Sequence, residues 1–380
     1  MGCGIVLMLL TCENFVHCTA IASLKYLAGV LSGMSMISAR VYQYQKPLAV
    51  ESMQRPKAQG AGVIVRVGAS GLCHSDLHLI AGEWKDSIPL RLPLVPGHEI
   101  AGYVEELGES VPKGLFEVGD LVAVFGGWGC GACAVCKRGD EQSCPRAKWP
   151  GISQDGGFAQ YVSVPSYRFL IKADKKLSAQ ELAPLTDAGL TPYRALRRFR
   201  HVLVPGTSVA VVGIGGLGSY GVQYARLFGP ASTVIAVDRN EKKLDLAKKF
   251  GADYGLVMSE GLGKQVRELT GGRGVDLVLD CAGSDNTVSA SAGLLGKGGV
   301  LAIVGLFGQT IKIPLFPAVI NENVVAGSLW GNYNELAEVV ELARLGKIQH
   351  SLRAFALDDI NEAIDMLKSG QIAGRAVITP

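Results

Sequence analysis

Apolar runs alternate with helix-like segments through the second half of the chain. The first run, VAVVG at residues 209–213, enters a glycine-rich turn and then SYGVQYARLF at residues 219–228, which has the periodicity of a helix. Four more apolar runs follow in the same rhythm: TVIAV, VDLVLDCAG, GGVLAIVG and NVVAGSLWG. Near-continuous apolar runs of this kind are typical of parallel strands that are buried on both faces of a sheet. The pattern therefore predicts an α/β domain with a doubly wound parallel sheet.

The glycine-rich turn has the spacing Gly213-x-Gly215-x-x-Gly218. Glycines at these positions permit a tight turn, the close approach of a pyrophosphate and the packing of a helix on a strand. The pattern alone is weak evidence in a chain with 49 glycines, where an ordinary turn is the alternative. Here a strand precedes it, a helix follows it, and the next apolar run ends at Asp238, where an acid meets the adenosine ribose hydroxyls. We expect NAD to bind through Gly213, Gly215, Gly216, Leu217, Gly218 and Asp238.

One glycine-rich loop carries a Cys-x2-Cys-x2-Cys-x7-Cys motif, formed by Cys130, Cys133, Cys136 and Cys144. Four thiolates this close can complete a tetrahedral zinc site without an open position, so the metal would stabilise the loop and take no part in catalysis. Two disulfides are the alternative, but we find no convincing export signal and expect the thiols to stay reduced. A nucleic-acid-binding zinc ribbon is a second alternative, yet Lys137 and Arg138 are balanced by Asp140 and Glu141, so no basic patch is expected.

A second set of metal-binding side chains is distributed over two turns upstream of the cysteine loop. GLCHSDLH, after the strand-like run VIVRV, offers Cys73, His74 and His78, and PGHE offers His98 and Glu99. Sparse ligands on separate loops are typical of catalytic zinc, which must keep one coordination position open for substrate. Each residue alone is more often a small buried thiol or a hydrogen-bonded histidine, so the prediction depends on their joint occurrence.

These motifs, in this order, resemble those of the zinc-dependent alcohol dehydrogenases of the medium-chain dehydrogenase/reductase superfamily. The resemblance extends from about Met36 to Pro380 and is strongest toward the bacterial and archaeal secondary-alcohol dehydrogenases. It is carried by CHSDLH, PGHEIAGYVEELG, GWGCGAC, APLTDAGLTPYRAL, VGIGGLG and GRAVITP. It implies a GroES-like β-rich catalytic domain and a Rossmann domain, with the active site in the cleft between them. The family's first strand would fall in ARVYQYQKPL at residues 39–48.

The resemblance assigns the catalytic zinc to Cys73, His98 and Asp187. Many members have a cysteine at the third position, whereas this chain has an aspartate there, as some secondary-alcohol members do. A carboxylate has the same formal charge as a thiolate, and zinc accepts oxygen ligands. A helix N-cap is the alternative role for Asp187. The same resemblance implies that Glu99 lies behind the ligands or approaches the metal transiently, and that Asp76 hydrogen-bonds the zinc-bound histidine.

In the implied mechanism zinc lowers the pKa of the alcohol, and the carbinol hydride passes to NAD. Ser75 matches the hydroxyl that contacts the substrate oxygen, and His78 matches the histidine that relays the proton to solvent. A turn hydroxyl and an exposed helix position are the alternatives for these two residues. Weaker matches are the cofactor contacts His74, Thr191, Arg239, Lys243 and Arg375 and the substrate-pocket residues Trp84 and Trp330. Each of these residues is equally compatible with an ordinary surface or core position.

Length and charge agree with a two-domain enzyme that acts on a small molecule. The 380 residues suffice for two to three domains of roughly 150 residues each. The resemblance places the GroES-like zinc catalytic domain at 36–186 and 331–380 and the Rossmann NAD-binding domain at 187–330. A net charge of +3 gives no reason to expect nucleic acid or a membrane as partner. We expect two zinc ions per subunit, a small alcohol, aldehyde or ketone as substrate, and a cytoplasmic homo-oligomer, a tetramer being favoured over a dimer.

Residues 1–35 fit neither domain. They are apolar but lack a basic opening region, and Glu13, His17 and Lys25 interrupt them before an apolar run of about 18 residues is reached. We expect a leader or an overlong reading-frame start, and a cryptic signal or an interfacial anchor is the alternative.

The scaffold does not fix the substrate, so a polyol or sugar dehydrogenase, or an aldehyde reductase, is the main alternative function. A protein that senses nicotinamide cofactors without turnover is a further alternative, against which the intact set of Cys73, Ser75, His78 and His98 argues. For the cofactor, the Asp238 carboxylate would repel a 2′-phosphate and favour NAD over NADP, an effect that the adjacent Arg239 would partly offset.

Overall fold

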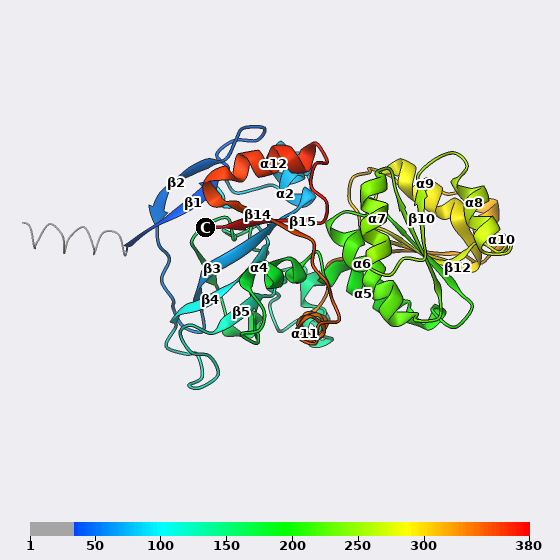
Figure 1. Cartoon of the computed structure of the whole chain (residues 1–380). Helices are drawn as coiled ribbons and strands as arrows, with labels where there is room; N and C mark the ends of the chain where they lie inside the picture. Colours follow the sequence, from blue (N-terminus) through cyan, green and yellow to red (C-terminus); the bar gives the residue numbers. More distant parts are fainter. Residues whose placement is uncertain (1–33) are drawn as a thin grey trace, which may run out of the picture.

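The computed structural model describes residues 34–380, which form two bodies, each built on its own large sheet (Figure 1). In Figure 1 a mixed sheet with strands from both ends of the described chain lies on the left, and a parallel sheet lies on the right. The predicted leader at 1–35 falls almost entirely outside the described residues. Within 34–380, no helix has both the length and the apolar character needed to cross a membrane.

The parallel sheet has the strand order β10-β9-β8-β11-β12-β13, and every neighbouring pair is parallel. Its strands coincide with the predicted apolar runs, apart from the short edge strand β10: β8 (Ser208–Val212), β9 (Thr233–Asp238), β10 (Tyr254–Val257), β11 (Val275–Asp280), β12 (Leu295–Ile303) and β13 (Val324–Gly327). The helices of this body are α5 (Leu190–Arg198), α6 (Gly216–Phe228), α7 (Glu241–Lys249), α8 (Leu262–Leu269), α9 (Asp285–Leu294) and α10 (Leu315–Ile320).

Alternate residues of each parallel strand enter two different cores, because successive side chains of a strand point to opposite faces. Val209 and Val211 of β8 pack in the core that contains residues of α5 and α6. Ala210 and Val212 pack in a separate core that contains residues of α8 and α9. The sheet is therefore covered on both faces, and the predicted doubly wound α/β fold is confirmed.

The mixed sheet has the order β14-β15-β3-β4-β5-β7, with β6 beside β3. Its strands are β3 (Val63–Leu72), β4 (Glu99–Leu107), β5 (Leu121–Val124), β6 (Tyr161–Val164), β7 (Leu170–Lys172), β14 (Leu352–Ala356) and β15 (Arg375–Thr379). The α-helices around it are α2 (His74–Ala81), α3 (Ala134–Lys137), α4 (Ala179–Leu182), α11 (Tyr333–Arg344) and α12 (Ile360–Lys368). The short 3₁₀ helices of the two bodies together are η1 (Glu141–Ser143), η2 (Tyr167–Phe169), η3 (Ala183–Thr186), η4 (Arg200–Val202) and η5 (Leu357–Asp359).

The first strand begins earlier than predicted. β1 (Ser35–Arg40) pairs antiparallel with β2 (Ala49–Gln54), and most of the expected strand at 39–48 forms the connection between them. Gln45 in this connection has a positive φ of 62°, and Pro47 lacks the N–H that a strand ladder uses. The first strand is therefore formed by the segment SMISAR and not by ARVYQYQKPL.

Strand pairing at one end of the mixed sheet determines where the site lies. Leu72, the last residue of β3, pairs with Ala376 of β15, and Gly71 pairs with Glu99, the first residue of β4. Cys73, His98 and Arg375, which adjoin these paired positions along the chain, consequently meet at the same end of the sheet.

Candidate active site

Three ligand atoms converge at this sheet end. His98 Nε2 lies 3.5 Å from Asp187 Oδ2, and Cys73 Sγ lies 3.8 Å from the same oxygen. Cys73 and His98 are buried, while the Asp187 side chain is 14% exposed. Zinc bonds of about 2.0–2.3 Å in a tetrahedron put neighbouring ligand atoms roughly 3.3–3.8 Å apart, so the three residues fit three positions around a zinc ion. A Glu99 carboxylate oxygen belongs to the same group of potential ligand atoms, which all lie within 4.8 Å of one another.

Asp76 contacts two of these residues. Its Oδ1 lies 3.2 Å from His98 Nδ1, and its Oδ2 accepts a hydrogen bond from the Cys73 backbone N–H at 2.9 Å. Because Nδ1 is held by a carboxylate, Nε2 is the nitrogen left to bind a metal. Burial lowers the pKa of His98, but the negative charge of Asp76 and hydrogen bonds to Asp187, Asp76 and Cys73 outweigh burial and raise that pKa well above its usual value. A dication would take the place of the bound proton.

Asp187 stands between η3 and α5, and its carboxylate does not cap the following helix. Gly189 is the N-cap of α5, and no side chain caps that end. The Asp187 carboxylate accepts a hydrogen bond from Thr191 Oγ1 at 2.7 Å. Burial raises the pKa of Asp187, but the hydrogen bond from His98 and the charges of His98 and Arg375 outweigh burial and keep this pKa well below its ordinary value. The carboxylate is therefore available as an anionic ligand.

Glu99 and Arg375 form a buried ion pair behind the three ligands. Arg375 Nε donates to Glu99 Oε2 at 2.9 Å, its Nη2 contacts Glu99 Oε1, and the same Nη2 lies 3.7 Å from Asp187 Oδ2. Burial raises the pKa of Glu99 to about 7, in spite of the opposing charge of Arg375. Glycine is required at position 71, because a Cβ atom there would overlap with the Glu99 carboxylate. The predicted pyrophosphate residue thus also neutralises the acid behind the ligands.

Helix α2 presents the predicted relay residues. Ser75 and His78 both line the cleft beside Cys73. The His78 ring stacks on Trp84 with 4.8 Å between centroids, and its Nδ1 is hydrogen-bonded to the Glu83 carboxylate. Burial and the charge of Arg375 lower the pKa of His74 to about 4, so its ring is neutral at pH 7.

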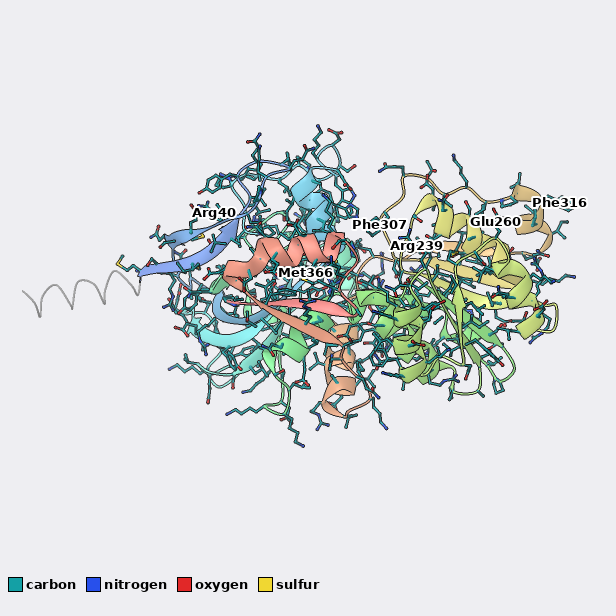
Figure 2. The ribbon with its side chains drawn as sticks, turned by 45° about the horizontal axis from the view of Figure 1, so that its top comes forward. Arg40, Arg239, Glu260, Phe307, Phe316 and Met366 are labelled. Carbon is teal, nitrogen blue, oxygen red and sulfur yellow. The ribbon has the colours of Figure 1, made fainter. Side chains whose placement is uncertain are left out.

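A cleft of about 1670 Å³ joins this site to the glycine-rich turn of the parallel sheet. Its lining includes Gly213, Gly215, Gly216, Leu217, Asp238, Arg239, Lys243, Thr191, Trp84, Trp330 and Arg375. Gly218 does not line it: a Cβ atom there would lie 2.1 Å from the Gly213 carbonyl oxygen, so this glycine allows the helix to pack on the turn. In Figure 2 Arg239 and Phe307 lie on the side of the parallel-sheet body that faces the mixed sheet.

Asp238 holds the glycine-rich turn in shape. Its Oδ2 accepts the Ile214 N–H at 2.7 Å, and its Oδ1 accepts the Asn240 N–H at 2.9 Å. Both oxygens retain a free lone pair, because a carboxylate oxygen can accept a second hydrogen bond. A ribose hydroxyl can therefore bind here without breaking the turn.

Trp330 forms one wall near the ligands. Its Nε1 donates to the Thr186 carbonyl at 2.7 Å, and its ring lies edge-on to His98 with 5.9 Å between centroids. Gly126 leaves room for the indole, since a Cβ atom there would lie 2.3 Å from Trp330 Cζ2. The ring is consequently fixed against the site and lines the cleft.

The four cysteines of the 130–144 loop form a separate, closed cluster. The Cys130–Cys136, Cys133–Cys136 and Cys133–Cys144 sulfur pairs are 3.9, 3.5 and 3.8 Å apart. A disulfide needs about 2.05 Å, whereas a tetrahedron with Zn–S bonds of about 2.3 Å has edges of roughly 3.8 Å. The arrangement fits a zinc ion and excludes disulfides among these residues. Backbone N–H groups of Ala132 and Cys133 lower the pKa of Cys130 to about 6.

The two acids near this cluster, Asp140 and Glu141, form ion pairs with arginines that are distant in the sequence. Glu141 makes two 3.0 Å hydrogen bonds with Arg168, and Asp140 accepts from Arg194 at 2.9 Å. Both acids turn toward the body of the protein, because arginines far along the chain reach them there. Sequence proximity was therefore a poor guide to charge pairing.

Sequence reasoning missed two residues that contact the proposed relay. Glu83 follows the glycine that ends α2, and a helix-terminating glycine was the only local signal for its position. Phe307 reaches His74 and His78 from the loop after β12, with centroid distances of 5.0 and 4.8 Å. No pattern near Phe307 in the sequence indicates this contact.

Comparisons with known proteins agree with this geometry. The family model described as Alcohol dehydrogenase GroES-like domain matches residues 59–175, and the one described as Zinc-binding dehydrogenase matches residues 216–344. The chain is similar to the NAD-dependent alcohol dehydrogenase of Sulfurisphaera tokodaii, with 38% identity over 353 residues, 91% of this chain and 100% of that protein. It is also similar to the D-arabinose 1-dehydrogenase (NADP(+)) of Saccharolobus solfataricus, with 34% identity over 346 residues, 90% of this chain and 97% of that protein.

Among solved structures, the alcohol dehydrogenase of the hyperthermophilic archaeon Aeropyrum pernix is similar to this chain with a TM-score of 0.86 and 42% sequence identity. The match covers 90% of this chain and 100% of that one.

Proposed function

The chain belongs to the zinc-type alcohol dehydrogenases of the medium-chain dehydrogenase/reductase superfamily, and from that premise we propose the reaction and the residues that carry it. It is an NAD-dependent oxidoreductase that transfers a hydride reversibly between an alcohol and NAD, with an aldehyde or ketone as product. The observation that supports the site best is the convergence of Cys73, His98 and Asp187 in the cleft that the glycine-rich turn also lines.

The residues of the cleft divide into three roles. Zinc and NAD, when bound, would supply acidification of the alcohol hydroxyl and acceptance of the hydride. Cys73 and Asp187 contribute two negative charges and His98 a nitrogen, which together balance a dication. Ser75 orients the substrate hydroxyl, and His78 takes up its proton.

The cofactor is held from both bodies. The N-terminus of α6 at the glycine-rich turn faces the pyrophosphate, where aligned N–H groups favour an anion. Arg375 supports this placement, because its guanidinium lies against Gly216, where a Cβ atom would be 2.5 Å from Nη1. His74, Thr191 and Lys243 complete the lining on the cofactor side.

Asp238 makes NAD the preferred cofactor. A 2′-phosphate would lie beside a carboxylate already fixed by two backbone N–H groups, so repulsion cannot be relieved by rotation. The exposed Arg239 partly offsets that repulsion. A kcat/KM for NADP equal to or above the kcat/KM for NAD would contradict this preference.

We assign two zinc ions to each subunit, one to the cleft and one to the four-cysteine loop. The sulfur spacing in the loop supports a second, structural ion, because all four positions around the metal would be filled by protein. Metal analysis of the purified protein tests the count.

The substrate is proposed to be a small apolar primary or secondary alcohol. The lining of the cleft includes the apolar side chains Trp84, Ile88, Trp149, Ile152, Leu329 and Trp330. Such walls would leave most hydroxyls of a sugar without partners, a cost that disfavours polyols. A sugar dehydrogenase remains the second candidate because of the similarity to the D-arabinose 1-dehydrogenase. An aldehyde reductase and a nicotinamide-binding protein without turnover are the remaining alternatives.

A homo-oligomer is supported by the far end of the parallel-sheet body. Strand β13 lies at the edge of the sheet, and the neighbouring helix α10 exposes Leu315, Phe316, Val319 and Ile320. Figure 2 shows Phe316 at the end remote from the mixed sheet. An open strand edge beside an apolar helix is suited to pairing with a second copy. The tetramer, the cytoplasmic location and the domain boundaries at 36–186, 187–330 and 331–380 are proposed from the family resemblance.

One experiment decides between these functions. The purified protein is supplied with zinc and NAD, and NADH formation at 340 nm is measured with primary alcohols, secondary alcohols, polyols and aldose sugars. We expect the highest kcat/KM for an apolar alcohol. Turnover of sugars alone would establish the second candidate, and NADH binding without any turnover would leave a binding protein.

A further inference from the structure

Glu83 lies against the proposed relay histidine because a glycine turn ends α2. Gly82, with a φ of 74°, terminates the helix and reverses the chain, and a Cβ atom there would meet the Tyr44 ring at 2.9 Å. The backbone N–H of Glu83 donates to the His78 carbonyl at 3.0 Å. The Glu83 carboxylate is thereby brought to His78 Nδ1, with which it forms a hydrogen bond.

The His78 ring has neighbours on its other sides that hold this geometry. Trp84 stacks on its face at an interplanar angle of 24°, and Phe307 meets it edge-on at 75°. The His78 side chain is 9% exposed, whereas that of Glu83 is 55% exposed. Glu83 therefore connects a buried imidazole to bulk water.

We propose that Glu83 is a positioning residue for proton release, an inference that rests on the function proposed above. An ionised carboxylate only accepts hydrogen bonds, so it selects the neutral imidazole with its proton on Nδ1 and leaves the lone pair on Nε2. When Nε2 takes up the proton that the alcohol hydroxyl releases, the ionised Glu83 carboxylate stabilises the resulting imidazolium through Nδ1–H. Loss of the Nε2 proton to water then returns His78 to its Nδ1–H form with Glu83 still ionised, and NAD, when bound, would accept the hydride that carries the electron pair.

The first test compares three variants at saturating substrate. Glu83→Gln keeps an oxygen that accepts from Nδ1–H, whereas Glu83→Ala removes both the acceptor and the charge. We expect kcat for alcohol oxidation to fall about 3-fold in Glu83→Gln and about 10- to 30-fold in Glu83→Ala, below the 10²- to 10⁴-fold that a general base contributes. KM for alcohol and NAD should change less than about twofold. The control Asp86→Asn removes an exposed carboxylate from the same segment and should retain wild-type kcat.

Chemical rescue separates proton transfer from a structural role. Added imidazole should restore the kcat of Glu83→Ala with increasing concentration and leave the wild type unchanged. In a His78→Gln background, Glu83→Ala should cost no further activity, because both residues serve one step. Three results would each overturn the proposal. They are a wild-type kcat in Glu83→Ala, a loss of kcat that imidazole does not restore, and an additive loss of kcat in the double variant.

A measurement that needs no turnover keeps this inference separate from the proposed function. Nitrogen-15 NMR of labelled histidine reports which ring nitrogen of His78 carries the proton. We expect Nδ1–H in the wild type and a shift toward Nε2–H in Glu83→Ala. A wild-type ring with its proton on Nε2 would overturn the role of Glu83. Absence of NADH formation by the wild type would instead overturn the proposed function.

Discussion

The two candidate metal clusters are built in opposite ways. The closed cluster takes four sulfurs from the single segment 130–144, so its geometry is local. The open cluster takes its atoms from the end of β3, the residue before β4 and the end of η3, and Cys73 and Asp187 are 114 positions apart. The first is filled by its own ligands, whereas the second has a side that faces a cleft of about 1670 Å³. In this chain the site assembled by the sheet faces the cleft, whereas the site made by one loop is surrounded by its own four sulfurs.

Substitution of Asp187 in the open cluster is the strongest test of this difference between the two clusters. Asp187→Ala removes one of two anions from the ligand set, so we expect the cleft zinc to be lost and kcat to fall more than about 100-fold, beyond the effect of losing a residue that only orients a ligand. Asp187→Cys should retain the ion, because charge and coordination are preserved. Zinc analysis beside steady-state kinetics checks both variants. An alanine variant with full zinc and near-normal kcat would remove Asp187 from the site.

The corresponding change in the closed cluster should act on stability. Cys133→Ala leaves three sulfurs, so we expect one zinc ion to be lost and the free energy of unfolding to fall by on the order of 3 kcal/mol, which corresponds to a drop in Tm of roughly 5–10 °C. Molecules that remain folded should keep most of their kcat. Calorimetry and metal analysis measure the effect, and an unchanged Tm with full zinc content would show that the loop needs no metal.

Arg194 tests whether the clusters are independent. It binds Asp140 of the cysteine loop at 2.9 Å and Glu335 of α11 at 2.8 Å, and it lies on α5, the helix that follows Asp187. Arg194→Met leaves the nearly buried Glu335 without its main partner, so we expect a loss of about 1–3 kcal/mol in the free energy of unfolding. The kcat should fall less than about threefold. A larger fall in kcat with both zinc ions present would show that the loop positions Asp187 through α5.

Arg168 should give the smallest effect. Its ion pair with Glu141 has side chains that are 39% and 19% exposed, and one nitrogen also donates to the Gly129 carbonyl at 2.7 Å. Partial exposure limits the contribution of such pairs to about 0.2–1 kcal/mol. Arg168→Gln should therefore lower Tm by a few degrees at most, without loss of zinc or kcat. Zinc loss from this variant would mean that the arginine, and not the metal, holds the loop closed.

The sequence predicted local features well and distant partnerships poorly. The spacing of Cys130 to Cys144 and the turn at Gly213 are encoded within a few residues, because ligand distance and backbone conformation depend on near neighbours. The predicted position of Asp187 came from the resemblance alone, since no spacing rule connects it to Cys73. The pairing of Glu99 with Arg375, 276 positions apart, depends on the antiparallel register of β15 on β3 and was not foreseen.

The contribution of β15 to the open cluster also determines which of the two clusters can be completed first during synthesis of the chain. During synthesis the segment 130–144 is complete long before Arg375 is added, so the closed cluster can capture its metal on an unfinished chain. The ligands Cys73, His98 and Asp187 likewise emerge before Arg375, but β3 then lacks its neighbour β15, and Glu99 lacks its cation. Until that last strand docks, a carboxylate destined for burial must stay hydrated. The residues of the four-cysteine cluster are thus all synthesised before Arg375, the cation on which the base of the candidate active site depends.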